Sequence, residues 1–242
     1  MNKNQIFLVE EKLQGKEFSL QVFSDGKSIF PMPLVRDYKR AYDGDKGLNT
    51  GSMGSYSLPD HNLPFLSKKD VDSALNILRK TIKALHKHFG VYYRGILYGQ
   101  FMKTNYGIFL VEFNARFGDP EAINVLKLLE TDFNKLCLNM IDGSMKSANF
   151  SSLATVCTYL VPEGYPTSPV EGTKITIEPK LDVDLYFASV YREKSIIKST
   201  KSRAIALLST GKKLEEAKDK VYSNLSKIKG KLFYRKDIGV LL

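Results

Sequence analysis

Hydrophobic and polar residues alternate in short runs through the first half of the chain, and this alternation predicts strands. The expected strands span residues 5–11, 17–23, 27–32, 95–102 and 107–114. Ser24-Asp25-Gly26 is expected to form a hairpin turn, because glycine tolerates the positive φ that such turns need. From residue 69 to residue 89 the hydrophobic residues recur at helical spacing, and Gly90 marks the expected end of that helix.

A second part of the chain mixes strands and helices again, after a polar stretch over residues 143–152. The remaining elements are expected as helices over 120–130, 132–141 and 214–228, and as strands over 153–161, 174–177, 184–191 and 203–208. Strands with separate covering helices predict an α+β fold. We expect two domains, with a mostly antiparallel sheet and covering helices in residues 1–146 and a smaller α+β domain in residues 147–242.

A candidate metal site lies on the strand expected over residues 107–115. Side chains alternate along a strand, so Glu112 and Asn114 share one face while Val111 and Phe113 point to the other, which we expect to be core. A carboxylate and an amide two residues apart lie about 7 Å apart along the strand. Such hard oxygen ligands can converge on Mg²⁺ or Mn²⁺, with phosphate completing the shell.

The residues that follow this strand have two interpretations. Arg116 can offer its planar guanidinium to an anion. Asp119 is suited to cap the next helix, Pro120 to occupy its first position and Glu121 to favour its positive end. A strand, a turn and a capped helix would explain the last three residues without any ligand, so that alternative stays open.

Residues 36–56 are rich in glycine and in charges of both signs, and they lack strand or helix periodicity. We expect a long functional loop, because glycines let backbone amides approach an anion while basic side chains neutralise it. Asp37 could hold an amine or an ammonium group. The other candidates in this loop are Lys39, Arg40, Asp43, Asn49, Thr50 and Gly51.

A third candidate stretch follows the first expected strand. Backbone groups near Glu10, Glu11 and Leu13 could meet an adenine edge, and Glu17 could accept hydrogen bonds from ribose hydroxyls. Taken by itself, this stretch is better explained as an ordinary strand end with exposed acids.

The composition of the chain bears on three further questions, namely nucleic-acid binding, membrane insertion and cellular location. The chain has 242 residues and a net charge of +10, with the basic excess concentrated after residue 174. A lysine-rich solvated surface is favoured over RNA binding, since no RNP-type motif or zinc knuckle accompanies the charge. Apolar runs fall far short of the ~20 residues that span a bilayer. Two cysteines in apolar stretches favour buried thiols and a cytoplasmic location.

Three motifs in order along the chain resemble a known enzyme family. They are Asp37-x-Lys39-Arg40-Ala-x-Asp43-Gly-Asp45-Lys46-Gly-x-Asn49-Thr50-Gly51-x-Met53-Gly54-x-Tyr56-Ser57, then Gly95-Ile-Leu-Tyr98, then Glu112-Phe-Asn-Ala-Arg-Phe-Gly-Asp-Pro-Glu121. The tail from Tyr234 to Gly239 is similar too. Together they resemble phosphoribosylamine-glycine ligase, also called glycinamide ribonucleotide synthetase.

The resemblance implies the C-terminal part of an ATP-grasp enzyme of purine synthesis. That enzyme joins glycine to 5-phosphoribosylamine through glycyl phosphate and cleaves ATP to ADP and phosphate. The resemblance implies metal ligation by Glu112 and Asn114, adenine near residues 10–13, ribose at Glu17 and substrates at the loop from Asp37. It also implies catalytic roles for Arg116, Lys39 and Arg40.

Departures from the family pattern qualify this expectation. Family members begin with a Rossmann-like domain and a lysine-bearing ATP-grasp subdomain. We expect these parts to be on a separate N-terminal subunit, to have been lost, or to belong to a longer protein of which this chain is a fragment. Ser52, Tyr38 and Gln100 stand where the family usually has glycine, histidine and glycine. A non-catalytic nucleotide-binding or partner-binding remnant of the ligase is therefore the alternative function.

Overall fold

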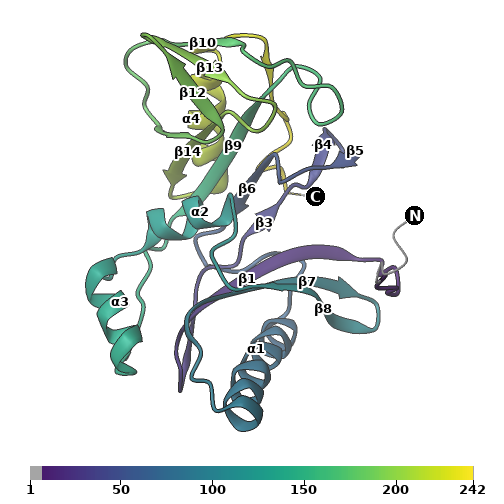
Figure 1. Cartoon of the computed structure of the whole chain (residues 1–242), viewed down its shortest axis with the longest axis vertical. Coiled ribbons are helices and arrows are strands. Elements are labelled where there is room, and N and C mark those ends of the chain that lie inside the picture. The colour runs from purple at the N-terminus through teal and green to yellow at the C-terminus, as the bar shows by residue number, and fades with distance from the viewer. Residues whose placement is uncertain (1–6, 242) are drawn as a thin grey trace.

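The structure is a computed structural model that describes residues 7–241. Figure 1 shows a lower part that contains a twisted sheet over one long helix, and an upper part that contains the C-terminal strands. The predicted α+β class is confirmed. The helices are α1 (Lys68–Phe89), α2 (Glu121–Leu128), α3 (Phe133–Asp142) and α4 (Leu214–Leu225). Among residues 7–241, no helix has the length and apolar character needed to cross a membrane.

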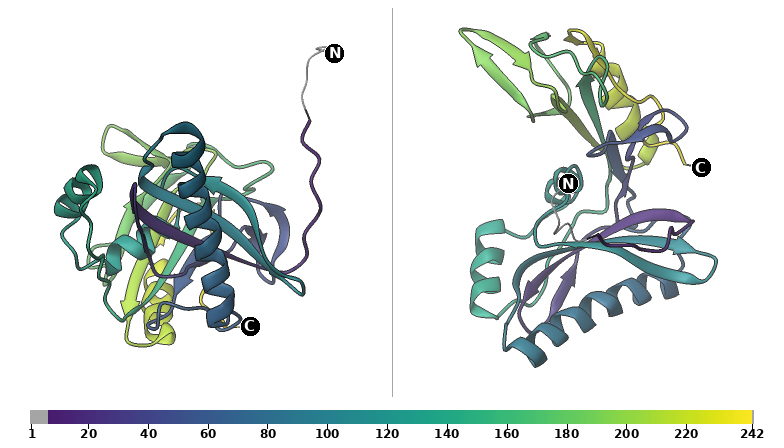
Figure 2. Two further views of the ribbon diagram at one scale, coloured as in Figure 1. Left: turned by 90° about the horizontal axis from the view of Figure 1, so that it is seen from below. Right: turned by 45° about the vertical axis from the view of Figure 1, so that its right-hand side comes forward.

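The lower sheet carries the strand with the candidate metal ligands. Its antiparallel order is β2-β1-β7-β8, made of β1 (Lys16–Asp25), β2 (Ile29–Pro31), β7 (Arg94–Thr104) and β8 (Gly107–Asn114). Alternate residues of β1, including Phe18, Leu20 and Val22, are buried in one hydrophobic core with Leu78 of α1. Figure 2 shows α1 along this one side of the sheet. On the opposite side, Phe23 of β1 packs in a second core with Leu136 of α3, and the rest of that side is left for polar chemistry.

Helix α1 confirms the helical periodicity and its expected end. Ser67 and Asp70 form a capping box at the start, and Gly90 ends the helix with φ of 67°. A capping box satisfies amide groups that the first helical turn leaves unpaired, while glycine adopts the left-handed conformation at low cost. Both ends of α1 are thus encoded locally.

The upper sheet joins strands from distant parts of the chain. Its order is β11-β14-β9-β6-β3, with β3 (Arg36–Asp37), β6 (Gly54–Ser57), β9 (Ala154–Pro162), β11 (Asp184–Phe187) and β14 (Ile205–Gly211). β16 (Leu232–Phe233) also pairs with β9. Every residue of β9 is buried, as expected of a central strand that helices contact. The upper sheet contains strands from before and after residue 146, and the division into two domains at that residue stays a prediction.

Two smaller pairings complete the described fold. The sheet β12-β13-β10-β15 contains β10 (Lys174–Ile177), β12 (Val190–Glu193), β13 (Ile196–Ser199) and β15 (Ile228–Lys229). Strands β4 (Arg40–Tyr42) and β5 (Lys46–Asn49) form a ribbon of their own.

The strand predicted over residues 5–11 is wrong where the structure describes it, and residues 5 and 6 lie outside the described part. Residues 7–15 form no strand, and Phe7, Leu8 and Val9 are 78%, 82% and 91% exposed. A strand needs a neighbour to satisfy its backbone groups, and β1 acquires one only at Lys16, which pairs with Lys103.

The expectation that residues 36–56 lack regular structure is also wrong. The segment contains β3, β4, β5 and the start of β6, and Gly54 pairs with Thr158 of β9. Pairing with a buried strand overrides the weak strand propensity of this glycine-rich sequence.

The single strand predicted over residues 184–191 is two strands in different sheets. Phe187 pairs with Ile205 of β14, whereas Val190 pairs with Ser199 of β13. The chain changes partner at Ala188 and Ser189, a step that hydrophobic periodicity does not encode.

Candidate functional site

The exposed face of β8 carries Glu112 and Asn114 side by side. Glu112 pairs with Gln100 and Asn114 pairs with Tyr98, and residues that pair directly across strands share one face of a sheet. The Asn114 amide donates a 2.9 Å hydrogen bond to Glu112 Oε1. Two oxygen-bearing side chains therefore stand together above the sheet, as their spacing predicts.

The other face of β8 is not core at Val111 and Phe113, which are 43% and 37% exposed. The register shifts between Gln100 and Phe101, so that Val111 falls between the paired residues Leu110 and Glu112. Such a bulge bends the strand and turns later residues away from their expected environment. The core expectation is therefore wrong here, and β8 packs against the core through the half-buried Ile108 and Leu110.

A cavity of about 220 Å³ opens beside Glu112 and Asn114. It brings together residues from the β3–β6 segment, from β7 and β8, and from the turn before α2. Its lining is Asp37, Lys39, Thr50, Gly51, Tyr98, Glu112, Asn114, Arg116, Gly118, Asp119 and Glu121. Most of the predicted catalytic, substrate and metal residues thus meet at one place.

The structure does not bring every predicted residue to this cavity. The Arg40 guanidinium donates to Gly47 O at 2.9 Å, and Asp43 accepts from Lys236 N at 2.8 Å. Asn49 lies exposed on β5. The two hydrogen bonds shape the loop, and any direct role for the three residues in binding stays a prediction.

The predicted nucleotide residues lie elsewhere as well. Glu10 and Glu11 are exposed and Leu13 is half-buried within the irregular segment 7–15, which Figure 2 shows extending from the body of the fold. Glu17 lies on β1, and Gln100 Nε2 donates to Glu17 Oε2 at 3.3 Å. Glu17 therefore shares the sheet face of Gln100 and of its partner Glu112.

Two buried carboxyl groups line the cavity. The Asp37 side chain is 3% exposed and Glu121 is 2% exposed. Burial, reinforced by the charge of Glu121, raises the pKa of Asp37 to about 8, although Lys39 opposes the shift. Burial likewise raises the pKa of Glu121, against the 2.8 Å hydrogen bond that the Tyr98 hydroxyl donates.

Glu121 and Tyr98 were not among the predicted site residues. Both stand in the quoted motifs, but Glu121 was assigned only to the positive end of a helix. The missed signal is a glutamate that directly follows a turn and precedes a hydrophobic helix, where its side chain can be turned inward.

Asp119 does not cap α2, and that prediction is wrong. The helix begins at Glu121 with Pro120 as its N-cap residue and without a side-chain cap. The Asp119 carboxylate instead accepts from Arg203 Nη2 at 2.8 Å and from the Tyr159 hydroxyl at 2.6 Å. The Arg203 guanidinium offers Asp119 a full opposite charge as well as hydrogen bonds, whereas a backbone amide at a helix start offers a hydrogen bond alone.

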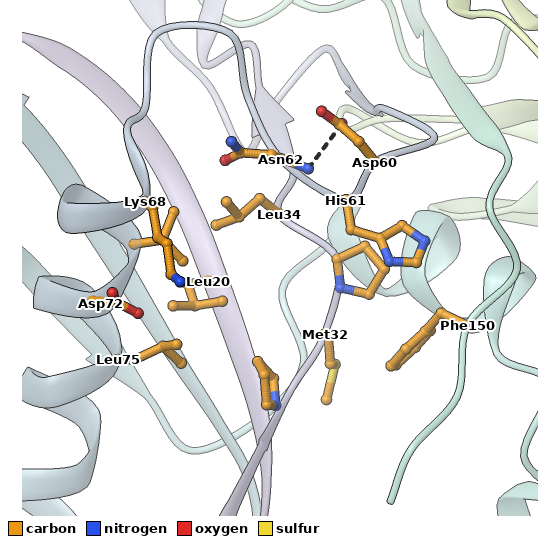
Figure 3. A pocket seen from close by; sticks show the side chains of 13 residues that line it. Leu20, Met32, Leu34, Asp60, His61, Asn62, Lys68, Asp72, Leu75 and Phe150 are labelled. Carbon is orange, nitrogen blue, oxygen red and sulfur yellow. Dashed lines mark hydrogen bonds between the residues drawn. The ribbon is translucent and has the colours of Figure 1, made fainter.

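A second cavity of about 350 Å³ lies between β1, the start of α1 and the segments 31–34 and 60–62 (Figure 3). Leu20 lines it from the α1 side of the sheet, whereas the polar cavity lies on the Tyr98 side. Figure 3 shows mainly apolar side chains, and the backbone N–H of Asn62 donates to Asp60 Oδ1. None of the predicted site residues lies in it.

Two models of one protein family match this chain. Residues 2–122 match the family model for the ATP-grasp (A) domain of phosphoribosylglycinamide synthetase, and residues 155–241 match the model for its C domain. The chain belongs to the phosphoribosylglycinamide synthetase family.

Relatives named phosphoribosylamine--glycine ligase include proteins from Methanothermobacter thermautotrophicus and Pyrococcus furiosus, with 48% and 47% identity over 236 residues. These alignments cover 96% of this chain but only 54% and 53% of the two relatives. The chain thus spans about half the length of these family members.

Solved structures support the family fold. The phosphoribosylamine--glycine ligase of Thermotoga maritima superposes with a TM-score of 0.83 at 31% identity, over 94% of this chain and 56% of that one. A biotin carboxylase from Campylobacter jejuni, solved in a complex with an ATP analogue, superposes at 0.63 with 15% identity over 91% of this chain and 48% of that one. That second likeness shows only the shared fold. The predicted C-terminal part of an ATP-grasp fold is confirmed.

Proposed function

We propose that this chain supplies the metal-binding half of the ATP site and the substrate cavity of a phosphoribosylamine-glycine ligase. The reaction would join glycine to 5-phosphoribosylamine and convert ATP to ADP and phosphate. The observation that carries the proposal is the single cavity in which Asp37, Lys39, Arg116, Glu112 and Asn114 meet.

The donor set fits a divalent cation that is shared with nucleotide phosphates. Among residues 7–241, no group of three or more His, Cys, Asp or Glu side chains could hold a metal by itself. One carboxylate and one amide oxygen suit Mg²⁺ or Mn²⁺ when phosphate and water supply the other ligands. The bound cation would draw negative charge from the transferring phosphoryl group.

The protein groups would then orient two successive displacements. A glycine carboxylate oxygen attacks the γ-phosphorus of ATP, ADP leaves, and glycyl phosphate forms. The neutral amine of phosphoribosylamine attacks the glycyl carbonyl carbon, phosphate leaves with the bonding electrons, and the proton that the nitrogen loses passes to the departing phosphate or to water. Lys39 and Arg116 would stabilise the anionic groups, and the cavity would hold the reactants in line.

Further residues complete the proposal. Residues 10–13 would meet adenine, Glu17 would meet ribose, and Thr50, Gly51, Asn49 and Asp43 would position substrate through the β3–β6 segment. Residues 1–146 would form the ATP-grasp subdomain, and residues 147–242 would form the C-terminal domain. A polypeptide equivalent to the unmatched half of the relatives, as a separate N-terminal subunit, would complete the nucleotide clamp.

The test is reconstitution with that half. The full chain is mixed with the unmatched half of the M. thermautotrophicus ligase, and ADP release is followed with glycine and phosphoribosylamine present together or singly. We expect turnover only with both substrates, loss of turnover for Glu112→Ala, and retention for the surface control Glu130→Ala. ADP release that ignores glycine would refute the ligase function, and no release would favour the non-catalytic alternative.

A further inference from the structure

The apolar cavity of Figure 3 lies where two hydrophobic cores meet. Leu20 and Leu34 on its wall belong to the core over α1, and Met32 and Phe150 belong to the second core beside α3. Its volume of about 350 Å³ falls at the small end of the range for small-molecule sites. Protein cores are otherwise close-packed, and an unfilled space among core side chains costs stability. The cavity is therefore suited to a compact apolar molecule.

One polar atom on the cavity wall lacks a partner. The side-chain oxygen of Asn62, Oδ1, is buried and has no hydrogen-bond partner among the described residues. The orientation of the amide is set, because Asn62 Nδ2 donates to Leu66 O at 3.4 Å and a carbonyl oxygen can only accept. Native proteins seldom leave a buried acceptor unpaired, since doing so costs stability. A ligand with a hydrogen-bond donor would supply the missing bond.

His61 holds the rim of the cavity in a fixed position. Its φ of 59° is uncommon for a residue other than glycine. Its carbonyl accepts from Leu34 N at 3.1 Å, and its Nε2 atom lies 2.9 Å from Ser151 O. These bonds tie the rim to two other parts of the chain and keep the loop from collapsing into the space. The cavity is thus pre-formed, as small-molecule sites usually are.

The cavity also joins the two ends of the β3–β6 segment. Residues 31–34 lead into β3, and residues 60–62 follow β6. The chain between these ends carries four residues of the polar cavity, namely Asp37, Lys39, Thr50 and Gly51. A molecule that contacts both ends would restrain the segment, because a loop whose ends are held has fewer conformations to lose.

We propose that this cavity binds a neutral, compact heteroaromatic molecule with one ring N–H, and that the bound molecule restrains the β3–β6 segment. A ring N–H brings a donor for Asn62 without a further acceptor that would itself need a partner. Met32 and Phe150 make favourable contacts with aromatic rings. This binding needs neither ATP nor a substrate, so it is independent of the ligase function proposed above.

The charged side chains around the cavity do not favour an ionic ligand. Asp60, Lys68 and Asp72 are exposed and carry both signs of charge. Exposed charges of this kind contribute little to binding because water screens them. The apolar wall and the Asn62 oxygen therefore determine which molecule fits.

Indole and benzofuran are matched probes for this site, because the two rings have the same shape and only indole has an N–H. The chain contains no tryptophan, so the fluorescence of added indole is read without an indole signal from the protein. Benzofuran binding to the full chain is measured by displacement of indole. We expect indole to bind about fivefold more tightly or more, as one hydrogen bond to an unpaired acceptor allows. Equal affinities, or no indole binding to the folded chain, would overturn the inference.

Variants locate the bound probe. Asn62→Leu keeps the size of the side chain and removes the acceptor, so indole should lose its advantage over benzofuran. Val71→Phe narrows the cavity from α1 and should weaken both probes about tenfold or more. Asn76→Leu, on the exposed face of α1, is the control and should change neither affinity. A preference for indole that survives Asn62→Leu would refute the site. If a variant does not fold, the comparison of the two probes on the unaltered chain decides.

Hydrogen exchange tests the restraint. The amides of Tyr38, Thr50 and Met53 donate hydrogen bonds within the β3–β6 segment. With indole at about ten times its dissociation constant, their exchange should slow by about tenfold, because opening of the segment would require release of the ligand. The amides of β12 and β13, at the far end of the upper part in Figure 1, should exchange at an unchanged rate. Indole binding without slower exchange in the β3–β6 segment would contradict the restraint.

A polypeptide is the competing occupant of this cavity. The unmatched half of the M. thermautotrophicus ligase is added to the chain with indole bound. Retained indole fluorescence would support a small-molecule site. Displacement of indole by that polypeptide would assign the cavity to a protein contact and overturn the inference.

Discussion

The buried guanidinium of Arg235 lies 2.8 Å from the Asp45 carboxylate, although 190 residues separate them. Arg235 also donates to Arg40 O at 2.9 Å, and its guanidinium carbon lies 4.7 Å from the centre of the Tyr38 ring. Asp237 accepts a further bond from its Nη2 atom at 2.5 Å. The C-terminal tail therefore holds the segment that carries Asp37 and Lys39 in place.

Replacing Arg235 should loosen this segment. Arg235→Leu leaves two carboxylates and a backbone carbonyl without their hydrogen-bond donor. We expect the free energy of unfolding to fall by about 3 kcal/mol. This value is near the lower end for broken buried ion pairs, because Asp45 keeps contact with water. Urea unfolding measures the change, with exposed Lys236→Gln as the control. Equal stability of the two variants would contradict the anchoring role.

Gly54 lies where a side chain has no room. It has φ of 154°, and a Cβ atom there would stand 2.4 Å from Cys157 O. We expect Gly54→Ala to cost about 3 kcal/mol, because the backbone of β9 must move. Gly90→Ala is the matched control, since its φ is also positive but no atom lies within 4 Å of its Cβ position. Gly90→Ala should lower the free energy of unfolding by only about 1 kcal/mol. Thermal unfolding of the two variants makes the comparison.

Ser52 occupies a backbone conformation that favours glycine. Its φ is 93°, and its hydroxyl donates to Gly54 O at 3.0 Å. Ser52→Ala removes the hydrogen bond and keeps the strain, whereas Ser52→Gly removes both. We expect the glycine variant to be more stable than the alanine variant by about 1 kcal/mol or more. Calorimetry of both settles the order, and a more stable alanine variant would show that strain is not important here.

Asp37 should make the stability of the chain fall as the pH rises. Its pKa is raised from 3.8 to about 8, so between these values the folded state binds more protons than the unfolded state. The contribution of Asp37 to the free energy of unfolding is therefore greatest below pH 4. This contribution declines as the pH rises through about 8, by at most about 1.4 kcal/mol per pH unit.

Asp37→Asn should reduce this slope. Part of the slope should remain in this variant, because the pKa of Glu121 is also raised. Lys39 opposes the rise of both pKa values. Urea unfolding from pH 5 to pH 8 in the presence of a chelator makes the comparison. An identical slope in the variant would mean that Asp37 is ionised in the folded chain at every pH tested.

The metal ligands should matter for binding and not for folding. Glu112 is exposed and its only described hydrogen-bond partner is Asn114, so Glu112→Ala should change the free energy of unfolding by no more than about 0.5 kcal/mol. The same variant should weaken Mn²⁺ binding measured in the presence of ATP by electron paramagnetic resonance. Unfolding of this variant would restore a structural role for Glu112.

Local sequence determined the elements whose signals lie within a few residues. Helix α1 could be predicted because its periodicity, capping residues and Gly90 are adjacent in the chain. Glu112 and Asn114 could be placed on one face because a strand has a period of two residues. The motifs also indicated the family, since each combines several residue types at fixed spacing.

Only the tertiary structure decided which of these residues meet. Asp37 is a buried acid whose pKa is raised by its burial and by the charge of Glu121, which is distant in the chain, and Asp119 leaves its expected cap because Arg203 lies beside it. Val111 is exposed because of a register shift against β7. Local patterns encode backbone periodicity, whereas burial, strand register and charge pairing depend on residues brought together from distant parts of the chain.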